Sequence, residues 1–503
     1  MGWTIFILAT IGWHLGMYGM FRKAGIAPWK ALIPFYNTWC IVEKCGIKKV
    51  WFWLQLIPVA GQFITIWITI IFVMFFGKFG LLEHTATVFL PFFYFPYLGF
   101  SKTEKFKGIE VVKLYKKSAA REWVDAAVFA IVAATLIRTF IFEAYVIPSG
   151  SMEKTLLIND YLFVDKLAYG PRIPETPLSF PFVHNTLPFS ESKPSYLKWI
   201  ELPYMRLPGF GGIKRNDVVV FNFPEGDTII NETGYRSENP YYDVLRRDYH
   251  GNRDALWAEH DILVHPLDKT DNYIKRCIAV AGDTMMIRNA QLYINGVLVP
   301  VPPEAQTDYE VTTNGKGFSD DFLRNVLHLR LADDENKEFY PIGNSSNAYY
   351  FNMRAKDVAL LRKQPNVVKI DPIVDYDKSY LFPYDSAHKW TIDNYGPVWI
   401  PKKNTTVTLR PDNIGLYRRI ITVYEGNKLE EKNDGTYLIN GKPATTYTFK
   451  YNYYWMMGDN RHRSQDSRYW GFVPESCIVG RASLIWFSWD NGPRWSRLLK
   501  SIH

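Results

Sequence analysis

Residues 124–170 read VDAAVFAIVAATLIRTFIFEAYVIPSGSMEKTLLINDYLFVDKLAYG. The first part, 124–145, is apolar and long enough to cross the hydrocarbon core of a bilayer as a helix, which takes about 20 residues. From Pro148 onward, β-branched and aromatic residues alternate with polar ones, a pattern typical of strands. We therefore predict a transmembrane anchor at 122–146 that leads directly into a mainly β domain.

The chain before this anchor is also rich in apolar runs. Three occur at 3–21, 51–76 and 85–100, and the first has neither a basic start nor a small-x-small cleavage site. That run is therefore interpreted as an uncleaved span rather than a signal peptide. We predict about four transmembrane helices in all, with residues 1–121 forming an N-terminal multi-span membrane module.

The placement of lysine and arginine predicts the orientation in the membrane. The loop 22–49 holds six basic residues and the loop 102–121 holds seven, whereas the 77–84 connection holds almost none. Basic loops stay in the cytoplasm, so everything after residue 146 is predicted to lie outside it. These two loops supply much of the net charge of +8, which argues against a nucleic-acid partner and fits a chain held in a lipid bilayer.

The exported part is predicted to contain two domains. Strand-like runs separated by Asn, Gly and Pro clusters dominate 147–296 and 436–503, which we assign to one β-rich domain. The stretches QLYINGVLVP (291–300) and TYLINGKPAT (436–445) share a strand–Asn-Gly–strand pattern that is typical of hairpins. Between them, residues 297–435 are long and mixed in pattern, and we predict an inserted cap domain of α+β or β type.

Two islands of the exported part carry groups suited to catalysis. In the first, at 147–170, Gly150 permits a tight turn that presents the hydroxyls of Ser149 and Ser151. In the second, DNYIKRCIAVAGDTM (271–285), Lys275 lies in an apolar strand. Burial lowers the pKa of a lysine amine, and a neutral amine is a competent general base for a serine hydroxyl. Taken singly, the two islands also fit an ordinary turn and a solvent-exposed lysine.

A third island, MMGDNRHRSQDSRYWGFVPESCIVGRASLIW (456–486), is dense in Asp, Asn, Arg and Ser. Arg461 and Arg463 stand where a calcium loop needs oxygen ligands, so an ion-pair network is the better interpretation. No signature of a metal or cofactor is present. The four cysteines are too few and too scattered for a disulfide scaffold, although a bridge between Cys277 and Cys477 is left open.

Together the three islands resemble the motifs of bacterial type I signal peptidases, membrane-bound endopeptidases with a serine–lysine dyad. The match follows the family's order through 124–170, 215–224, 271–297 and 436–503. The resemblance implies that Ser151 is the nucleophile and Lys275 the general base. It further implies that Ser149 adds a hydroxyl to an oxyanion hole beside the Ser151 N–H, and that Ser464 orients the lysine amine.

The resemblance also implies supporting and substrate-binding residues. Arg276 with Asp459, and Asp466 with Arg468, are expected as ion pairs that fix the third island against the dyad. The residues expected around the small-residue substrate pockets are Tyr145, Ile147, Pro148, Met152, Leu156, Tyr273 and Ile274. The implied substrate is the signal peptide of an exported preprotein, cut after a small-x-small sequence at the periplasmic face of the bacterial inner membrane. The translocation machinery is a further candidate partner, and no cofactor is implied.

Some features depart from this family, and two other functions compete. Glu153 with Lys154, and His462 with Arg463, replace residues typical of the family, while the N-terminal segment resembles a small module fused to some of these enzymes. A Ser-His-Asp hydrolase is one rival, but the exported part lacks a Gly-x-Ser-x-Gly elbow. Its candidate histidines are His184, His250, His260, His265, His328, His388 and His462. A non-enzymatic membrane scaffold with a degenerate peptidase domain is the other.

Overall fold

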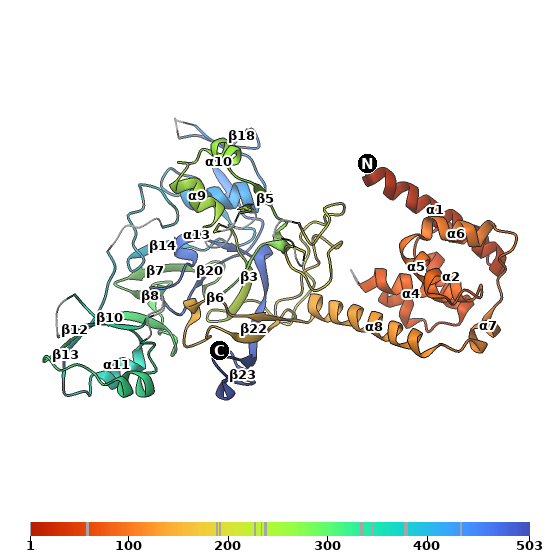
Figure 1. Ribbon diagram of the computed structural model, residues 1–503. Coiled ribbons are helices and arrows are strands. Elements are labelled where there is room, and N and C mark those ends of the chain that lie inside the picture. Colours follow the sequence, from red (N-terminus) through yellow and green to blue (C-terminus); the bar gives the residue numbers. More distant parts are fainter. Residues whose placement is uncertain are drawn as a thin grey trace. The chain divides into compact units, whose positions relative to one another are not determined.

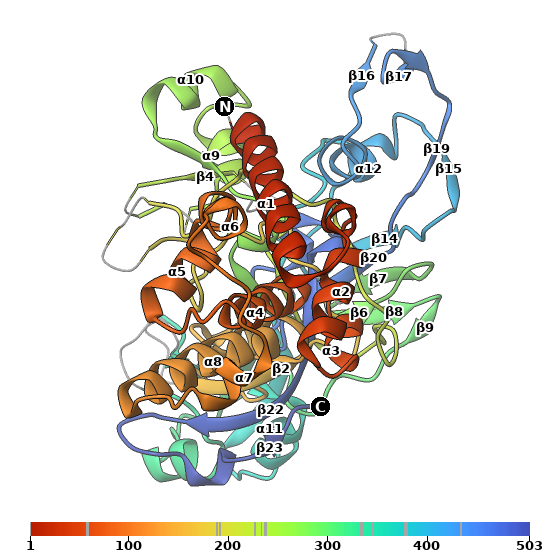
Figure 2. The same cartoon turned by 90° about the vertical axis from the view of Figure 1, so that its right-hand side faces the viewer.

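The protein folds into two units, which Figures 1 and 2 show as mainly helical and mainly β. The computed structural model describes residues 2–503 except 57–59, 188, 189, 191, 192, 226, 227, 233, 236–238, 332–336, 344–346, 377–380, 433 and 434. By their internal contacts, Met1–Thr139 and Ile173–Pro203 form the first unit. Phe140–Arg172 and Tyr204–His503 form the second.

The first unit is built from helices. They are α1 (Gly2–Ala24), α2 (Tyr36–Cys45), α3 (Val50–Leu54), α4 (Ala60–Met74), α5 (Leu81–Phe89), α6 (Pro91–Phe100), α7 (Ile109–Leu114) and α8 (Ala119–Phe140). α1 packs on α6 through glycines, because a Cβ added at Gly12 or Gly16 would lie 2.6 or 2.4 Å from backbone atoms of α6. The missing side chains let the two helix backbones approach closely.

One helix among the described residues is both long and apolar enough to cross a membrane, and it is α8. The apolar run 51–76 is divided between α3 and α4 around residues 57–59, which lie outside the described part of the chain. The run 85–100 is divided between α5 and α6, where Leu90 ends one helix and Pro91 begins the next. The prediction of about four spans therefore stays a prediction.

The second unit is organised around an eight-stranded antiparallel sheet. Its order is β1 (Phe142–Val146), β2 (Asp160–Asp165), β22 (Ile478–Ser488), β3 (Val218–Asn222), β6 (Asn272–Ala279), β20 (Tyr453–Met457) and β21 (Val473–Pro474), with β23 (Lys500–Ser501) beside β22. β3 is buried throughout, since Val219 packs on one face of the sheet and Val220 on the other. The prediction of a mainly β exported region is confirmed.

A second sheet and a small separate sheet contain the two Asn-Gly turns. β14 (Tyr395–Trp399), β7 (Thr284–Arg288), β8 (Gln291–Ile294) and β9 (Val297–Leu298) pair in that order, and β16 (Leu429–Glu431), β17 (Tyr437–Ile439) and β18 (Lys442–Pro443) pair in theirs. Asn295 and Gly296 have φ angles of 52° and 79°, and Asn440 and Gly441 have 51° and 77°. Two-residue hairpin turns need such positive values. Both predicted hairpins are confirmed.

Residues 306–372 form a lobe with a sheet and a core of their own, and we call it the inserted lobe. Its strands pair in the order β11 (Phe339–Pro341), β12 (Ala348–Arg354), β10 (Gln306–Thr313) and β13 (Val367–Pro372), next to α11 (Ala355–Leu361). Its buried apolar residues, among them Val311, Leu327 and Phe351, form a separate cluster. Figure 1 shows this lobe in teal, to one side of the main sheet.

The later part of the predicted 297–435 insertion packs differently from the inserted lobe. Residues such as Leu381, Tyr395 and Ile420 join the core that also contains Met285 and Trp455. The remaining strands and α-helices are β4 (Thr228–Ile230), β5 (Ile262–Val264), α9 (Tyr241–Arg247), α10 (Arg253–Glu259), β15 (Thr406–Thr408), α12 (Ile414–Arg419), β19 (Thr446–Thr448) and α13 (Ser467–Trp470). The domain bounds drawn from the sequence stay a prediction.

Candidate active site

Ser151 and Lys275 meet in the second unit. Ser151 lies on a single 3₁₀ turn, Gly150–Met152, which follows β1, and Lys275 lies in the middle of β6. The Nζ of Lys275 donates a hydrogen bond of 2.6 Å to the Oγ of Ser151. An amine that loses its own proton at this distance is placed to take the proton of the hydroxyl. The pair thus has the geometry of a nucleophile and its base.

Burial tunes the amine of Lys275. The residue is 4% exposed, and burial lowers its pKa to about 8. The negative charges of Asp466 and Asp459 oppose that lowering but do not cancel it. A base works best when its pKa lies near the working pH, so this lysine is adjusted toward proton transfer.

Arg276, the next residue on β6, binds the third island, which in turn contacts the segment that carries Ser151. We call the turn Gly150–Met152 the nucleophile turn, because it carries the predicted nucleophile. Its guanidinium donates to both carboxylate oxygens of Asp459, at 2.8 and 2.7 Å, and both side chains are buried. Asp459 also accepts a 2.6 Å bond from the Thr155 hydroxyl, and its N–H points to the sulfur of Met152 at 3.4 Å. One carboxylate therefore links the lysine strand to the segment that carries the serine.

A second buried ion pair stiffens the third island itself. Arg468 donates to Asp466 at 2.9 and 2.8 Å, and Asp466 accepts the Gly458 N–H at 3.1 Å. Ser464 is buried against Gly458, and its hydroxyl donates a long bond of 3.4 Å to the Gln465 carbonyl. A hydrogen bond from Ser464 to the amine of Lys275 stays a prediction.

Asn460 holds the backbone of the nucleophile turn from the same island. Its N–H donates to the carbonyl of Ser151 at 3.1 Å, and its side-chain amide donates to the carbonyl of Gly150 at 3.2 Å. The two bonds fix both carbonyls of the turn on one side. Sequence reasoning missed Asn460, although its position inside the third island was the available signal.

The remaining sequence-predicted residues surround the dyad at different depths. Ser149 is exposed, with its Oγ 3.5 Å from the Oγ of Ser151, and Pro148 is also exposed. Five of the predicted substrate-pocket residues pack in or against one core cluster, and these are Tyr145, Ile147, Met152, Leu156 and Ile274. Tyr273 packs in the other cluster with Trp470, and the Nζ of Lys275 lies 5.8 Å from its ring centroid.

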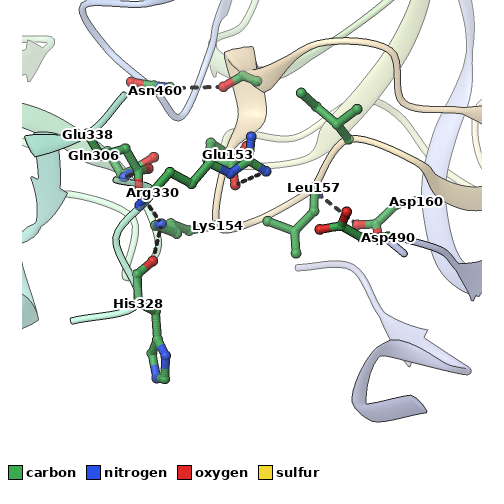
Figure 3. Close-up of polar contacts among 12 residues, drawn as sticks. Glu153, Lys154, Leu157, Asp160, Gln306, His328, Arg330, Glu338, Asn460 and Asp490 are labelled. Atoms are coloured by element: carbon green, nitrogen blue, oxygen red, sulfur yellow. Dashed lines mark hydrogen bonds and ion pairs between the residues drawn. The ribbon is translucent and has the colours of Figure 1, made fainter. Parts of the chain in front are cut away.

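Sequence reasoning also missed the environment of Glu153 and Lys154. They are the second and third residues after Ser151, and both side chains are paired with charged residues of the inserted lobe (Figure 3). Those partners, Arg330 and Glu338, belong to no motif and stand more than 170 residues away in the sequence. The only signal was the departure from the family pattern at these two positions.

Several described histidines have carboxylate partners. Among these pairs are His260 with Glu232 at 3.0 Å, His388 with Asp385 at 2.8 Å, and His462 with Asp393 at 2.8 Å and with Asp308 at 3.7 Å. The other ring nitrogen of His462 is 3.2 Å from the Thr307 hydroxyl. Ser151 is hydrogen-bonded to Lys275 instead, so the geometry favours a lysine base over a histidine triad.

Comparison with protein families gives two matches. A family described as signal peptidase, peptidase S26, matches residues 120–335 and 403–489. A family of unknown function, DUF5684, matches residues 29–109. The first match covers Ser151, Lys275 and Ser464, and the second covers much of the helical region before α8.

Curated relatives show the same likeness over most of the chain. A signal peptidase I of Buchnera aphidicola (subspecies Acyrthosiphon pisum) is 24% identical over 357 residues, which cover 71% of each chain. The one of Haemophilus influenzae is 25% identical over 405 residues, covering 78% of this chain and 79% of the relative. The one of Helicobacter pylori (strain 26695) is 25% identical over 74% of this chain and 89% of its own.

Proposed function

Because the chain belongs to the signal peptidase family, peptidase S26, we propose that it cleaves signal peptides through a dyad of Ser151 and Lys275. The family and the relatives named signal peptidase I make it a serine endopeptidase of this class. The observation that carries the dyad is the 2.6 Å hydrogen bond between Lys275 Nζ and Ser151 Oγ.

The proposed reaction begins with neutral Lys275. It takes the hydroxyl proton of Ser151 while Oγ bonds to the carbonyl carbon of the scissile peptide. The oxyanion that forms accepts hydrogen bonds from the Ser151 N–H and the Ser149 hydroxyl, and the loss of one such donor typically costs about 2.7–4 kcal/mol in the transition state. The Lys275 ammonium then gives its proton to the leaving amine as the C–N bond breaks. Water, with Lys275 again as base, hydrolyses the remaining Ser151 ester.

An open strand edge beside the dyad supports an extended substrate. β20 pairs with β6 from Arg276 onward, so within the described strands residues 272–275 have a ladder partner on the β3 side alone. A peptide can add to such an edge as a further strand. We propose that the signal peptide lies there, with its small side chains in pockets lined by Tyr145, Ile147, Pro148, Met152, Leu156, Tyr273 and Ile274. Pockets that admit only small side chains would account for cleavage after a small-x-small sequence.

The membrane arrangement is part of the proposal. α8 is the candidate anchor, and the basic loops at 22–49 and 102–121 favour a multi-span N-terminal module with residues after 146 outside the cytoplasm. Preproteins would meet the site while their own apolar segments lie in the bacterial inner membrane. The translocation machinery that delivers them remains a predicted neighbour.

A processing assay tests the dyad. The full chain in lipid vesicles is given a preprotein with a small-x-small site, and the mature product is followed with time. We expect Ser151→Ala and Lys275→Ala each to lower the rate at least about 1,000-fold, as removal of members of a serine triad does. Wild-type processing by either variant would overturn the dyad.

The same assay separates the two rival functions. His462→Ala removes the buried histidine–carboxylate pair and is expected to leave cleavage by the dyad in place, so loss of chemistry in this variant alone would favour a histidine mechanism. A non-enzymatic scaffold predicts no product from wild type at any preprotein concentration. Mass spectrometry of the product termini then checks whether the cut follows a small-x-small sequence.

A further inference from the structure

The segment directly after the nucleophile carries two buried charges that the proposed reaction does not use. Glu153 is 4% exposed, and the side chain of Lys154 is 8% exposed. Neither is hydrogen-bonded to Ser151 or Lys275. Burying charges is unfavourable unless they are paired, so two adjacent ones beside a nucleophile call for a physical reason.

The amine of Lys154 is held by two acceptors of the inserted lobe. Its Nζ donates to the Oε2 of Glu338 at 2.8 Å and to the carbonyl of His328 at 2.9 Å (Figure 3). Glu338 is itself fixed, because it also accepts the side-chain amide of Gln306 at 2.8 Å and the N–H of Arg330 at 2.9 Å. Because Glu338 is held by these two other bonds, a movement of Lys154 with the turn would break its ion pair with Glu338.

Glu153 makes the opposite pair with the same loop. Its carboxylate lies 3.1 Å from the guanidinium of Arg330, whose N–H already contacts Glu338. At neighbouring positions of the segment, the acidic Glu153 faces the basic Arg330 and the basic Lys154 faces the acidic Glu338. This alternation fixes the register of the segment, because a shift by one residue would place like charges together.

The inserted lobe also contacts the other wall of the site. The N–H of Gln306 donates to the Asp459 carbonyl at 2.8 Å, and the N–H of Arg461 donates to the Gln306 carbonyl at 3.0 Å. The amide of Asn352 donates to the side-chain oxygen of Asn460 at 3.1 Å. The lobe therefore holds the third island and the nucleophile turn at the same time.

We propose that Glu153 and Lys154 are positioning residues through which the inserted lobe keeps Ser151 within reach of Lys275. This rests on the proposed function of the dyad. The turn is one 3₁₀ turn long, so its place depends on what holds its neighbours as well as on the bonds from Asn460. A displacement of about 1 Å at a reacting atom is enough to slow a reaction about 100-fold. The inserted lobe acts on the rate of bond cleavage in this proposal, not on capture of the substrate.

The test is a comparison of kcat and KM for the full chain in vesicles. Lys154→Met keeps the length of the side chain but removes its charge, and Glu338→Gln removes the partner charge. We expect each to lower kcat about 10- to 100-fold while KM changes less than about threefold, because ground-state binding at the strand edge is untouched. The double variant should be about as slow as either single one, since the two residues act as one pair. Lys154→Arg, which restores the charge, should recover most of the rate.

A matched control separates positioning from general stability. Asp357→Asn breaks the pair of Arg354 and Asp357, which lies in the inserted lobe with side-chain exposures of 11% and 2%, close to the 8% and 2% of Lys154 and Glu338. Arg354 and Asp357 make no hydrogen bond to the nucleophile turn. We expect Asp357→Asn to lower the thermal midpoint at least as much as Lys154→Met while its kcat stays within about twofold of wild type.

Each outcome bears on one proposal. If Asp357→Asn slows kcat as much as Lys154→Met, the effect is loss of lobe stability and the positioning role is overturned. If Lys154→Met keeps wild-type kcat while Ser151→Ala is inactive, the positioning role fails and the dyad stands. If Ser151→Ala still cleaves, the proposed function itself fails, whatever Lys154 does.

Discussion

Lys275 is a lysine that the fold keeps out of water, and this determines how the site works. Its amine is buried at the middle of a central strand, and its hydrogen bond goes to the Ser151 hydroxyl. In the proposed mechanism, this burial supplies a neutral base without a histidine. The same burial makes the residue unfavourable for folding when it is charged, so catalysis and stability pull this side chain in opposite directions.

The rate of cleavage should rise with pH through the pKa of Lys275, which burial lowers to about 8. Below that pH the amine is protonated and cannot accept the serine proton. We therefore expect kcat/KM to increase about tenfold for each pH unit below 8 and to level off above it. Steady-state rates between pH 5.5 and 9.5 measure this, and a flat profile with chemistry rate-limiting would contradict a lysine base.

Replacing Lys275 by methionine should abolish cleavage and stabilise the second unit. The pKa of the amine falls on folding from its ordinary value of 10.5 to about 8. At about 1.4 kcal/mol per pKa unit, charging it at pH 7 costs the native state about 3 kcal/mol. Between pH 8 and 10.5 the unfolded state binds more protons, so wild-type stability rises with pH there and the advantage of the variant shrinks. Urea unfolding of both proteins at pH 7 and pH 10.5 measures this, and equal stabilities at pH 7 would count against a buried amine.

At the scale of elements, the two Asn-Gly hairpins and the inserted lobe show what sequence could predict. The hairpins depend on two adjacent residues, so local turn chemistry was enough. The packing of residues 381–421 with β7 and β20 depends on contacts across the chain, which no local pattern encodes. The ion pairs of Glu153 and Lys154 could not be predicted for the same reason, because their partners are distant in the sequence.

Gly296→Ala should weaken the hairpin of β8 and β9. Gly296 has a φ of 79°, and an added Cβ would meet no atom within 4 Å, so the cost comes from the backbone alone. An alanine in this left-handed region costs about 1–2 kcal/mol, part of which is offset by the lower entropy of its unfolded chain. We expect a net loss of about 1 kcal/mol in the free energy of unfolding. Gly212→Ala, at a position equally open but outside the left-handed region, is the control and should change stability by less than about 0.5 kcal/mol.

At the scale of the whole molecule, the candidate anchor α8 and the proposed nucleophile Ser151 are close together along the chain. α8 ends at Phe140 and β1 begins at Phe142, so one residue joins the candidate anchor to the main sheet. Ser151 is the eleventh residue after Phe140, the end of α8, which allows a span of at most about 40 Å when the chain is fully extended. The motifs predicted this closeness from sequence, because anchor and nucleophile are neighbours in the chain.

The topology makes a prediction for intact cells. Residues 224–435 contain exposed segments such as Val368 and Tyr376, which an added protease can reach only from the side where the domain lies. We expect cleavage in this range when protease is added to spheroplasts, which expose the outer face of the cytoplasmic membrane. We expect none when protease is added to inverted membrane vesicles, which expose the cytoplasmic face. Fragment masses identify the cuts. Digestion from the cytoplasmic side alone would overturn the orientation.

The sulfur of Met152 has one more consequence. The side chain of Met152, the residue after Ser151, is fully buried, and its sulfur accepts the Asp459 N–H. A peroxide converts methionine to a polar sulfoxide only where it reaches the sulfur, and here it must wait for the turn to open. The rate of Met152 oxidation, measured by mass spectrometry, therefore reports how often the turn around Ser151 opens. In an oxidising compartment, a turn that stays closed would also protect Met152 from conversion to the sulfoxide.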